Sequence, residues 1–567
     1  MAKNIAYGVI IAAAILIVSG QTGLGAEEKI RTPGEASNFT QYTQHEDIVR
    51  FLSRLDHLSP ELEVRIVGRT LPVQNYGAKD IFLCILTEEG AGSPDSIDRS
   101  KPTFFLVAAK HGNEQSAKEA ALGLVRDLAV GELRPLLRDV NVLVLPTANP
   151  YGNALDQRSN EQGLDLNRDQ VKLESPETEA INRVFFTWMP EVTLDVHEKG
   201  DDYYRVSIGC VSNVNIHGRL QDFERGVLLV ETAQALAARN ITFHEYLITQ
   251  AMGIDSSAGV SYGREDTAGR QQMKRFSTTD LNDGRNSLGI YETLSFIQEG
   301  ASRHDLATLE ERTGYQYFGI RFLLESAARH GQEINALVRG LRSELEAKAS
   351  VYTEDDLVHL RMRYASDPGD PILTIQEYRR SRSPIRGILT VDKKAGDPLT
   401  AADIRPNPSG AEYQLIERVV DNWFPLVEPT LSVERPLGYI VPALHQDVIE
   451  TLVKHGLELH LFTTDFTLET EAYQIADIVS AQYDYLPPEK IVVENTAVMV
   501  VAKRGDIYVP CAQPAANLIP CLLEPQSQYG LIRYWMYRLV PEKGDVFPFL
   551  RVTKPGDLPL IPYRSWR

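Results

Sequence analysis

Residues 103–114 read TFFLVAAKHGNE, and this stretch decides the fold of the chain. Residues 103–109 form a continuous apolar run, which is expected of a strand buried on both faces of a sheet. Residues 115–130 follow with apolar side chains on one helical stripe: Ala117, Ala121, Leu124, Val125 and Leu128. A buried strand that leads directly into such a helix indicates an α/β layer fold.

The same alternation continues on both sides of this stretch. We expect strands at 61–67, 80–86, 140–146, 192–196, 241–248 and 288–298, and helices at 175–186, 220–238 and 306–329. The helix at 175–186 has a clear start signal, because a capping Ser175 is followed by Pro176 at the first helical position. The pattern predicts a mixed, largely parallel central sheet flanked by helices.

Composition changes after about residue 350. Residues 366–386 are rich in Pro, Gly and charge, and short β-like runs dominate beyond them, at 386–391, 412–420, 437–441, 491–503 and 506–509. One helical stretch, at 444–455, interrupts these runs. We therefore predict an α/β domain over 40–350, a linker over 351–384 and a β-rich C-terminal domain of unknown role over 385–567.

The N-terminus has the three parts of a secretory signal. Lys3 supplies a positive charge, an apolar run covers residues 5–18, and Gly25-Ala26 precede Glu27-Glu28. Leu24 makes a cleavage site after Ala26 imperfect, because a small residue is usual at that position. Residues 1–26 are predicted to be a signal peptide that directs export to the periplasm or the exterior, with an uncleaved N-terminal membrane anchor as the alternative.

Charge and cysteine content narrow the function classes. The 567 residues carry 58 Lys+Arg and 77 Asp+Glu, a net charge of −19, which disfavours general binding to nucleic acid. The four cysteines match no zinc-finger spacing. Cys511 and Cys521 could form a disulfide in an oxidising compartment, or all four could be small buried apolar residues.

Two polar segments that follow apolar strands carry metal-ligand chemistry. His111 and Glu114 are three residues apart at the end of the 103–109 strand, where ligands bind in open α/β sheets. Alone, this pair is more consistent with an ordinary surface contact. His197, which follows the apolar run 192–196, adds a second imidazole. Two His and one Glu leave a fourth position for water, which is the pattern of a catalytic zinc site.

These segments, together with three others, resemble the zinc metallocarboxypeptidases, the carboxypeptidase A-like group. The resemblance spans about 190 residues, from His111-Gly112-Asn113-Glu114 through Asn149-Pro150-Tyr151-Gly152, the run 164–169 (LDLNRD) and His197 to the run 295–299 (SFIQE). Tyr151 departs from the pattern, since the family has Asp there. Gly300 and Ala301 differ from many relatives, which puts the local pocket in doubt.

The resemblance implies a role for each matching residue. One Zn²⁺ would be held by His111, Glu114 and His197, and Glu299 would be the general base toward the activated water. Arg158 would polarise the scissile carbonyl, while Asn167 and Arg168 would hold a substrate's terminal carboxylate. The implied activity is hydrolysis of the C-terminal peptide bond of a peptide with a free carboxylate.

Two other functions stay open at the level of sequence. One is a related zinc amidase that acts on cell-wall peptides or N-acyl amino acids, and the other is a non-catalytic binding protein with a relict site. The tyrosine that closes over substrate in digestive carboxypeptidases cannot be located, although Tyr262 and Tyr291 are candidates. The residue that sets side-chain preference is not readable either.

Overall fold

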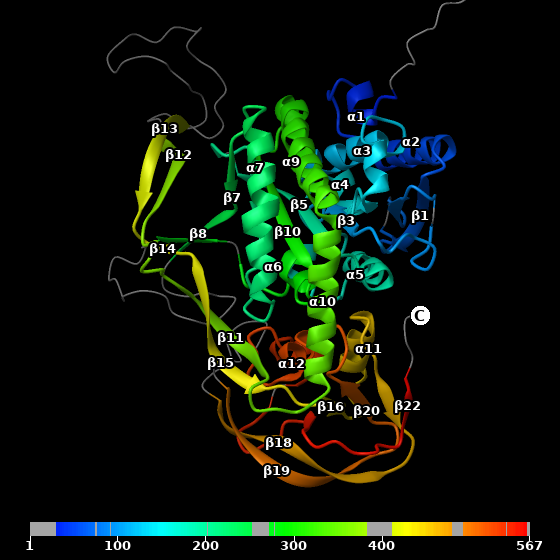
Figure 1. Cartoon of the computed structure of the whole chain (residues 1–567), viewed down its shortest axis with the longest axis vertical. Coiled ribbons are helices and arrows are strands. Elements are labelled where there is room, and N and C mark those ends of the chain that lie inside the picture. Colours follow the sequence, from blue (N-terminus) through cyan, green and yellow to red (C-terminus); the bar gives the residue numbers. More distant parts are fainter. Residues whose placement is uncertain are drawn as a thin grey trace, which may run out of the picture. The chain divides into compact units, whose positions relative to one another are not determined.

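The computed structural model of the chain describes residues 30–73, 76–90, 92–200, 202–251, 272–276, 278–382, 411–478, 491–539 and 541–563 (Figure 1). The predicted export segment, the predicted strand at 386–391 and Tyr262 lie outside these ranges. Within them, no helix combines the length and the apolar character that a membrane span requires. Thr32 and the described residues that follow it belong to one compact unit.

An eight-stranded sheet forms the centre of the α/β part. Its strands are, in spatial order, β1 (Leu62–Arg69), β2 (Asp80–Leu86), β4 (Asn141–Leu145), β3 (Thr103–Ala108), β5 (Val192–Gly200), β10 (Leu294–Ser302), β6 (Val206–Gly209) and β7 (Phe243–Glu245). The four central strands β4, β3, β5 and β10 run parallel, β1 and β2 pair antiparallel with their neighbours, and β6 pairs antiparallel with β10 and parallel with β7. The predicted mixed, largely parallel sheet is confirmed.

The apolar runs account for the centre of this sheet. Every residue of β3 and β4 is buried, as a strand covered on both faces requires. The helices of this part are α1 (Pro33–Ala36), α2 (His45–Leu58), α3 (Gln115–Ala129), α4 (Pro150–Ala154), α5 (Pro176–Trp188), α6 (Gly218–Phe223), α7 (Leu229–Ala237), α8 (Gly284–Gly289), α9 (Leu309–Arg329) and α10 (Gly331–Ala349). Ser175 caps α5 as predicted, with its hydroxyl accepting from the Thr178 N–H.

Two adjacent residues of β5, His197 and Glu198, point to opposite faces of the sheet. Glu198 contacts Ser116 of α3 and Arg312 of α9, so its side chain points to the face that these two helices cover. His197 precedes it in the strand and therefore points to the opposite face. Helix α9 packs against α3 and against α7 on the Glu198 side (Figure 1), which leaves the His197 side for the polar segments that follow β3 and β4.

Two predicted boundaries near the site are wrong. The strand expected over 288–298 begins only at Leu294, because residues up to Gly289 belong to helix α8, which Asp283 caps, and the chain then turns at Glu292 (φ 52°). His197 and Glu299 were expected at strand ends, but both lie three residues inside their strands. The parallel pairing of β5 with β10 continues to the Ser302–Gly200 pair, so the polar residues do not end it.

The C-terminal region is rich in β-structure, as predicted. Its main sheet has the order β19 (Ile491–Ala502), β18 (Phe466–Ile478), β21 (Leu550–Val552), β16 (Gly438–Val441), β20 (Ile507–Pro510), β17 (His460–Phe462) and β22 (Leu560–Pro562). Helices α11 (Gln446–Lys454) and α12 (Leu518–Leu523) accompany it. Ile440, Phe462, Ala502 and Val552 form a buried apolar cluster within this region.

Smaller ribbons join the two regions. The segment predicted as a linker carries β11 (Leu357–Ala365), which pairs with β15 (Leu426–Glu434), and β12 (Leu373–Arg382), which pairs with β13 (Ala411–Val420). Strand β14 (Trp423–Phe424) pairs with β9 (Gln272–Phe276), which also pairs with β8 (Leu247–Ala251). Backbone pairing therefore ties the residues after 420 to the α/β part.

Candidate metal centre and substrate site

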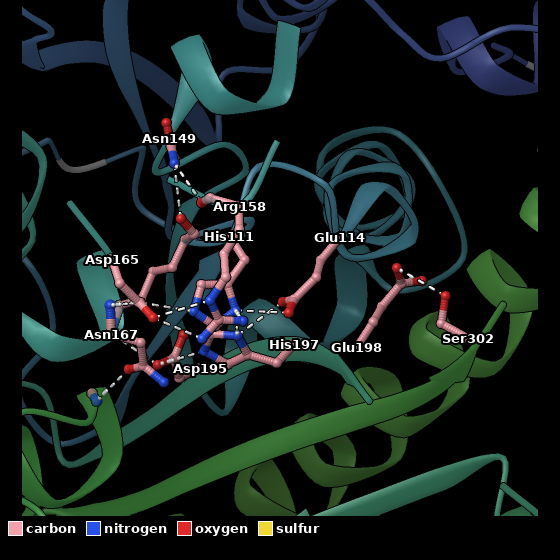
Figure 2. Close-up of polar contacts among 12 residues, drawn as sticks. His111, Glu114, Asn149, Arg158, Asp165, Asn167, Asp195, His197, Glu198 and Ser302 are labelled. Atoms are coloured by element: carbon pink, nitrogen blue, oxygen red, sulfur yellow. Dashed lines mark hydrogen bonds and ion pairs between the residues drawn. The ribbon is translucent and has the colours of Figure 1, made fainter. Parts of the chain in front are cut away.

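Three elements bring His111, Glu114 and His197 together. His111 follows β3 after Ala109, whose left-handed backbone (φ 56°) turns the chain away from the strand. Glu114 directly precedes α3, and His197 projects from β5. The ligand atoms of the three side chains all lie within 4.8 Å of one another (Figure 2). The sheet edge therefore assembles the three residues that sequence reasoning selected as metal ligands.

The donor atoms of this cluster converge on one point. His111 Nδ1 lies 2.7 Å from Glu114 Oε1, His197 Nδ1 lies 2.9 Å from Glu114 Oε2, and the two Nδ1 atoms are 3.1 Å apart. All three side chains are buried. Two imidazole nitrogens and one carboxylate form a set that zinc prefers, and three protein donors leave a position open. The residues present therefore fit the ion.

The charge state of Glu114 suits metal binding. Burial by itself would raise the pKa of this carboxyl group, but the neighbouring His111 and His197 outweigh it and lower the pKa to about 2. The group is consequently a carboxylate throughout the physiological range.

A carboxylate lies behind each imidazole ring. Asp165 Oδ1 is 3.1 Å from His111 Nε2, and Asp195 Oδ2 is 3.1 Å from His197 Nε2. The rings thus lie between Glu114 on one side and Asp165 and Asp195 on the other (Figure 2). Carboxylates in this position fix the orientation and tautomer of metal-binding histidines.

Asp195 is itself held by a buried cation. Lys110 Nζ donates to Asp195 Oδ2 at 2.8 Å, and both side chains are almost completely buried. Sequence reasoning missed Lys110 and Asp195. The signal for Asp195 was present, because residues two apart in a strand face the same side and Asp195 is two residues before His197.

Arg158 reaches the cluster from the loop after α4. Its Nε and Nη2 donate to Asp165 Oδ2 at 3.0 and 2.8 Å, and its Nη1 lies 3.2 Å from His111 Nδ1. The side chain is 47% exposed. A guanidinium that is tethered beside the metal ligands and still accessible is positioned to meet a substrate oxygen.

Asn167 and Arg168 lie on the adjoining turn. Asp165 Oδ1 accepts from the Asn167 N–H at 2.9 Å, and the buried Asn167 Oδ1 accepts from the Gly284 N–H at 3.0 Å. Arg168 is exposed, and its Nη1 donates to the Asn167 carbonyl at 2.6 Å. The structure therefore places a fixed amide and an accessible guanidinium next to the cluster.

Glu299 pairs in register with His197 across β10 and β5, so the two side chains share a face of the sheet. Burial, strengthened by the negative charge of Glu114, raises the pKa of Glu299 to about 7. Tyr246 lies beside Glu299, and burial together with the charge of Glu299 raises the pKa of the tyrosine hydroxyl; sequence reasoning missed this neighbour. A carboxyl group with a pKa near 7 is suited to accepting and returning a proton.

The remaining sequence candidates have no part in this cluster. Tyr291 is a core residue whose hydroxyl donates to the His455 carbonyl at 3.4 Å. Cys84, Cys210, Cys511 and Cys521 are all buried free thiols, so Cys511 and Cys521 are not paired.

Comparison with known proteins gives one family match. Residues 68–189 match the Peptidase_M14 family model, described as zinc carboxypeptidase. The matched segment contains His111, Glu114, Arg158, Asn167 and Arg168, whereas His197 and Glu299 lie beyond it.

Named relatives match most of the chain. Carboxypeptidase 2 of Trichophyton tonsurans is 23% identical over 496 residues, which is 82% of this chain and 79% of the relative. A probable carboxypeptidase 2 of Trichophyton verrucosum is 26% identical over 460 residues, 76% of each chain. Among solved structures, the metallo-carboxypeptidase of Pseudomonas aeruginosa is 21% identical, with a TM-score of 0.36, and covers 52% of this chain and 71% of its own.

Proposed function

We propose that this chain, a hydrolase of peptide bonds that carries a zinc carboxypeptidase domain, removes residues from the C-terminus of peptides. The observation that carries the proposal is the convergence of His111, Glu114 and His197 within 4.8 Å, with Glu299 on the same face of the sheet. We propose that this cluster holds one zinc ion. The ion, when bound, would supply a Lewis acid that polarises the scissile carbonyl and lowers the pKa of water.

Glu299 is the proton carrier in this proposal. Its carboxylate accepts a proton from the attacking water and returns it to the leaving amine. Burial supports this role, because the raised pKa of about 7 brings the two protonation states close in free energy at neutral pH.

Two arginines bind the two oxygen groups of the substrate that carry negative charge. Arg158, which is held beside His111 by Asp165, stabilises the oxygen that gains charge as the carbonyl is attacked. The exposed Arg168 binds the terminal carboxylate, with the Asn167 amide as a second donor. The pair explains why a free C-terminus would be required.

We further propose that the protein works outside the cytoplasm. The support is the charged, apolar and small-residue order of residues 1–26. Fractionation of producing cells and N-terminal sequencing of the protein test this. A cytoplasmic protein that retains Met1 would contradict it.

The test of the activity compares one peptide in two forms, with a free C-terminal carboxylate and with a C-terminal amide. Zinc-loaded protein is expected to shorten only the first form, one residue at a time from its C-terminus, as followed by mass spectrometry. Equal cleavage of both forms, or shortening from the N-terminus, would overturn the proposal.

A further inference from the structure

Arg285 is a buried cation for which the proposed mechanism has no use. It is the second residue of α8, and its side chain has no exposed surface. Its Nη2 donates to Asp283 Oδ2 at 2.6 Å and to the Thr278 carbonyl at 3.1 Å. Its Nε and Nη1 have no hydrogen-bond partner within the described part of the chain. A buried donor without an acceptor is unfavourable, so these two N–H groups of Arg285 are available to an acceptor that a ligand supplies.

The free Nη1 lies on the catalytic face of the sheet. A Cβ placed on Gly209 would be 3.0 Å from this nitrogen, 3.1 Å from Tyr246 Cβ and 3.2 Å from Ile297 Cγ2. Gly209 pairs with Ile297, and Glu299 lies two residues further along the same face of β10. Two strand residues span about 7 Å, so the guanidinium lies about one side-chain length from the proton carrier.

The carboxylate anchor contacts the backbone next to Arg285. Asn167 Oδ1 accepts from the N–H of Gly284, the residue that directly precedes Arg285. Arg285 is thus near both the groups for the terminal carboxylate and the group that acts at the scissile bond. In a substrate, a single Cα joins these two points, and the side chain of the C-terminal residue branches from that Cα.

We propose that Arg285 selects substrates whose C-terminal residue has an acidic side chain, an inference that rests on the proposed function. A carboxylate would accept charge-assisted hydrogen bonds from Nε and Nη1, while Asp283 keeps the guanidinium oriented. Since Arg285 has no exposed surface, the side chains of Tyr246 and Ile297 have to shift before the substrate carboxylate can reach the guanidinium.

Other C-terminal side chains of a substrate are expected to bind less favourably beside Arg285. An amide oxygen offers a weaker acceptor, an apolar side chain leaves both donors unmet, and a lysine or arginine adds a like charge. The expected order of preference at the C-terminus is therefore acidic, then amide, then apolar, then basic.

The experiment uses four N-acyl dipeptides that differ only in a C-terminal Glu, Gln, Leu or Lys. With the zinc-loaded full chain, kcat/KM for the Glu substrate is expected to exceed the Leu and Lys values at least tenfold. Arg285→Met is expected to reduce the Glu-to-Leu ratio at least tenfold, whereas Arg329→Met, at an exposed arginine paired with Glu231, leaves the ratio unchanged.

The Glu-to-Leu ratio of kcat/KM is measured within one preparation, so it does not depend on the fraction of protein that is folded. If Arg285→Met does not fold, the order of kcat/KM among the four dipeptides with wild-type protein still tests the inference. Fastest release of Leu or Lys, or an unchanged ratio in Arg285→Met, would overturn the inference and leave the proposed function intact. Release of none of the four residues by zinc-loaded protein would overturn both.

Discussion

The side-chain oxygen of Asn167 accepts a hydrogen bond from the backbone N–H of Gly284 at 3.0 Å. This bond joins the turn after Asp165 to the start of helix α8, which are 117 residues apart in the chain. It connects the proposed anchor for the substrate carboxylate with the residue before Arg285. The substrate site is therefore built from two loops that hold each other in place.

Gly284 is the first residue at which this arrangement can be tested. A Cβ there would lie 2.1 Å from Lys110 Nζ and 2.3 Å from Asp195 Oδ2. Gly284→Ala is therefore expected to displace the buried Lys110–Asp195 pair, lowering the melting temperature and weakening zinc binding together. Gly340→Ala, at a helix position with open space around the new methyl group, is the matched control. Normal zinc affinity in Gly284→Ala would contradict the packing described.

Asp195 is expected to set the affinity of the metal centre. Asp195→Asn removes the charge that faces His197 Nε2 and should weaken zinc binding about 10- to 100-fold. Competition with a chelator measures this without reference to activity. Asp222→Asn, at an exposed position on α6, should leave the affinity unchanged.

A buried lysine without its partner could destabilise Asp195→Asn. The double variant Lys110→Met with Asp195→Asn removes that unpaired charge and should show the same weakened zinc binding. Wild-type affinity in both variants would show that Asp195 has no role in positioning His197.

The raised pKa of Glu299 predicts the acid limb of the pH profile. The group must be ionised to accept a proton, and burial raises its pKa to about 7. The ionised fraction therefore falls as pH drops through 7, and kcat/KM should fall about tenfold per pH unit well below it. Initial rates of zinc-saturated enzyme between pH 5 and 8.5 measure this. A rate that stays constant from pH 5 to 7 would contradict the assignment.

The C-terminal region is expected to support the loop that leads into α8 and Arg285. The hydroxyl of Tyr529 lies 2.7 Å from Thr279 Oγ1, and the Asn282 amide donates to the Tyr534 hydroxyl at 2.9 Å. Replacing both tyrosines by phenylalanine should cost about 1 kcal/mol of stability per hydrogen bond and raise KM more than it lowers kcat. Tyr563→Phe, on a partly exposed residue near the C-terminus, serves as control. Unchanged KM in the double variant would show that the region does not support the site.

The strands and helix starts that depend on local sequence patterns were predicted correctly. Continuous apolar runs identified β3 and β4, and Ser175-Pro176 identified the start of α5. The boundary between α8 and β10 was missed, because apolar residues run through it and the turn at Glu292, with its left-handed backbone (φ 52°), has no sequence signal.

Only the site residues that belong to sequence motifs could be predicted. His111, Glu114 and His197 follow recognisable strands, so their convergence could be expected. Lys110, Tyr246 and Arg285 could not be selected, because their roles depend on neighbours distant in sequence: Asp195 for Lys110, Glu299 for Tyr246 and Gly209 for Arg285. The same holds for Tyr529 and Tyr534, whose partners lie about 250 residues earlier.

The most direct test compares wild type with Glu299→Gln after both are loaded with zinc. Metal analysis and mass spectrometry of one peptide substrate are performed on the same preparations, with Glu310→Gln, at an exposed residue of α9, as control. We expect one zinc per chain in all three proteins, stepwise loss of C-terminal residues with wild type and Glu310→Gln, and at least a hundredfold slower loss with Glu299→Gln. Loss at the wild-type rate by zinc-loaded Glu299→Gln would contradict the account.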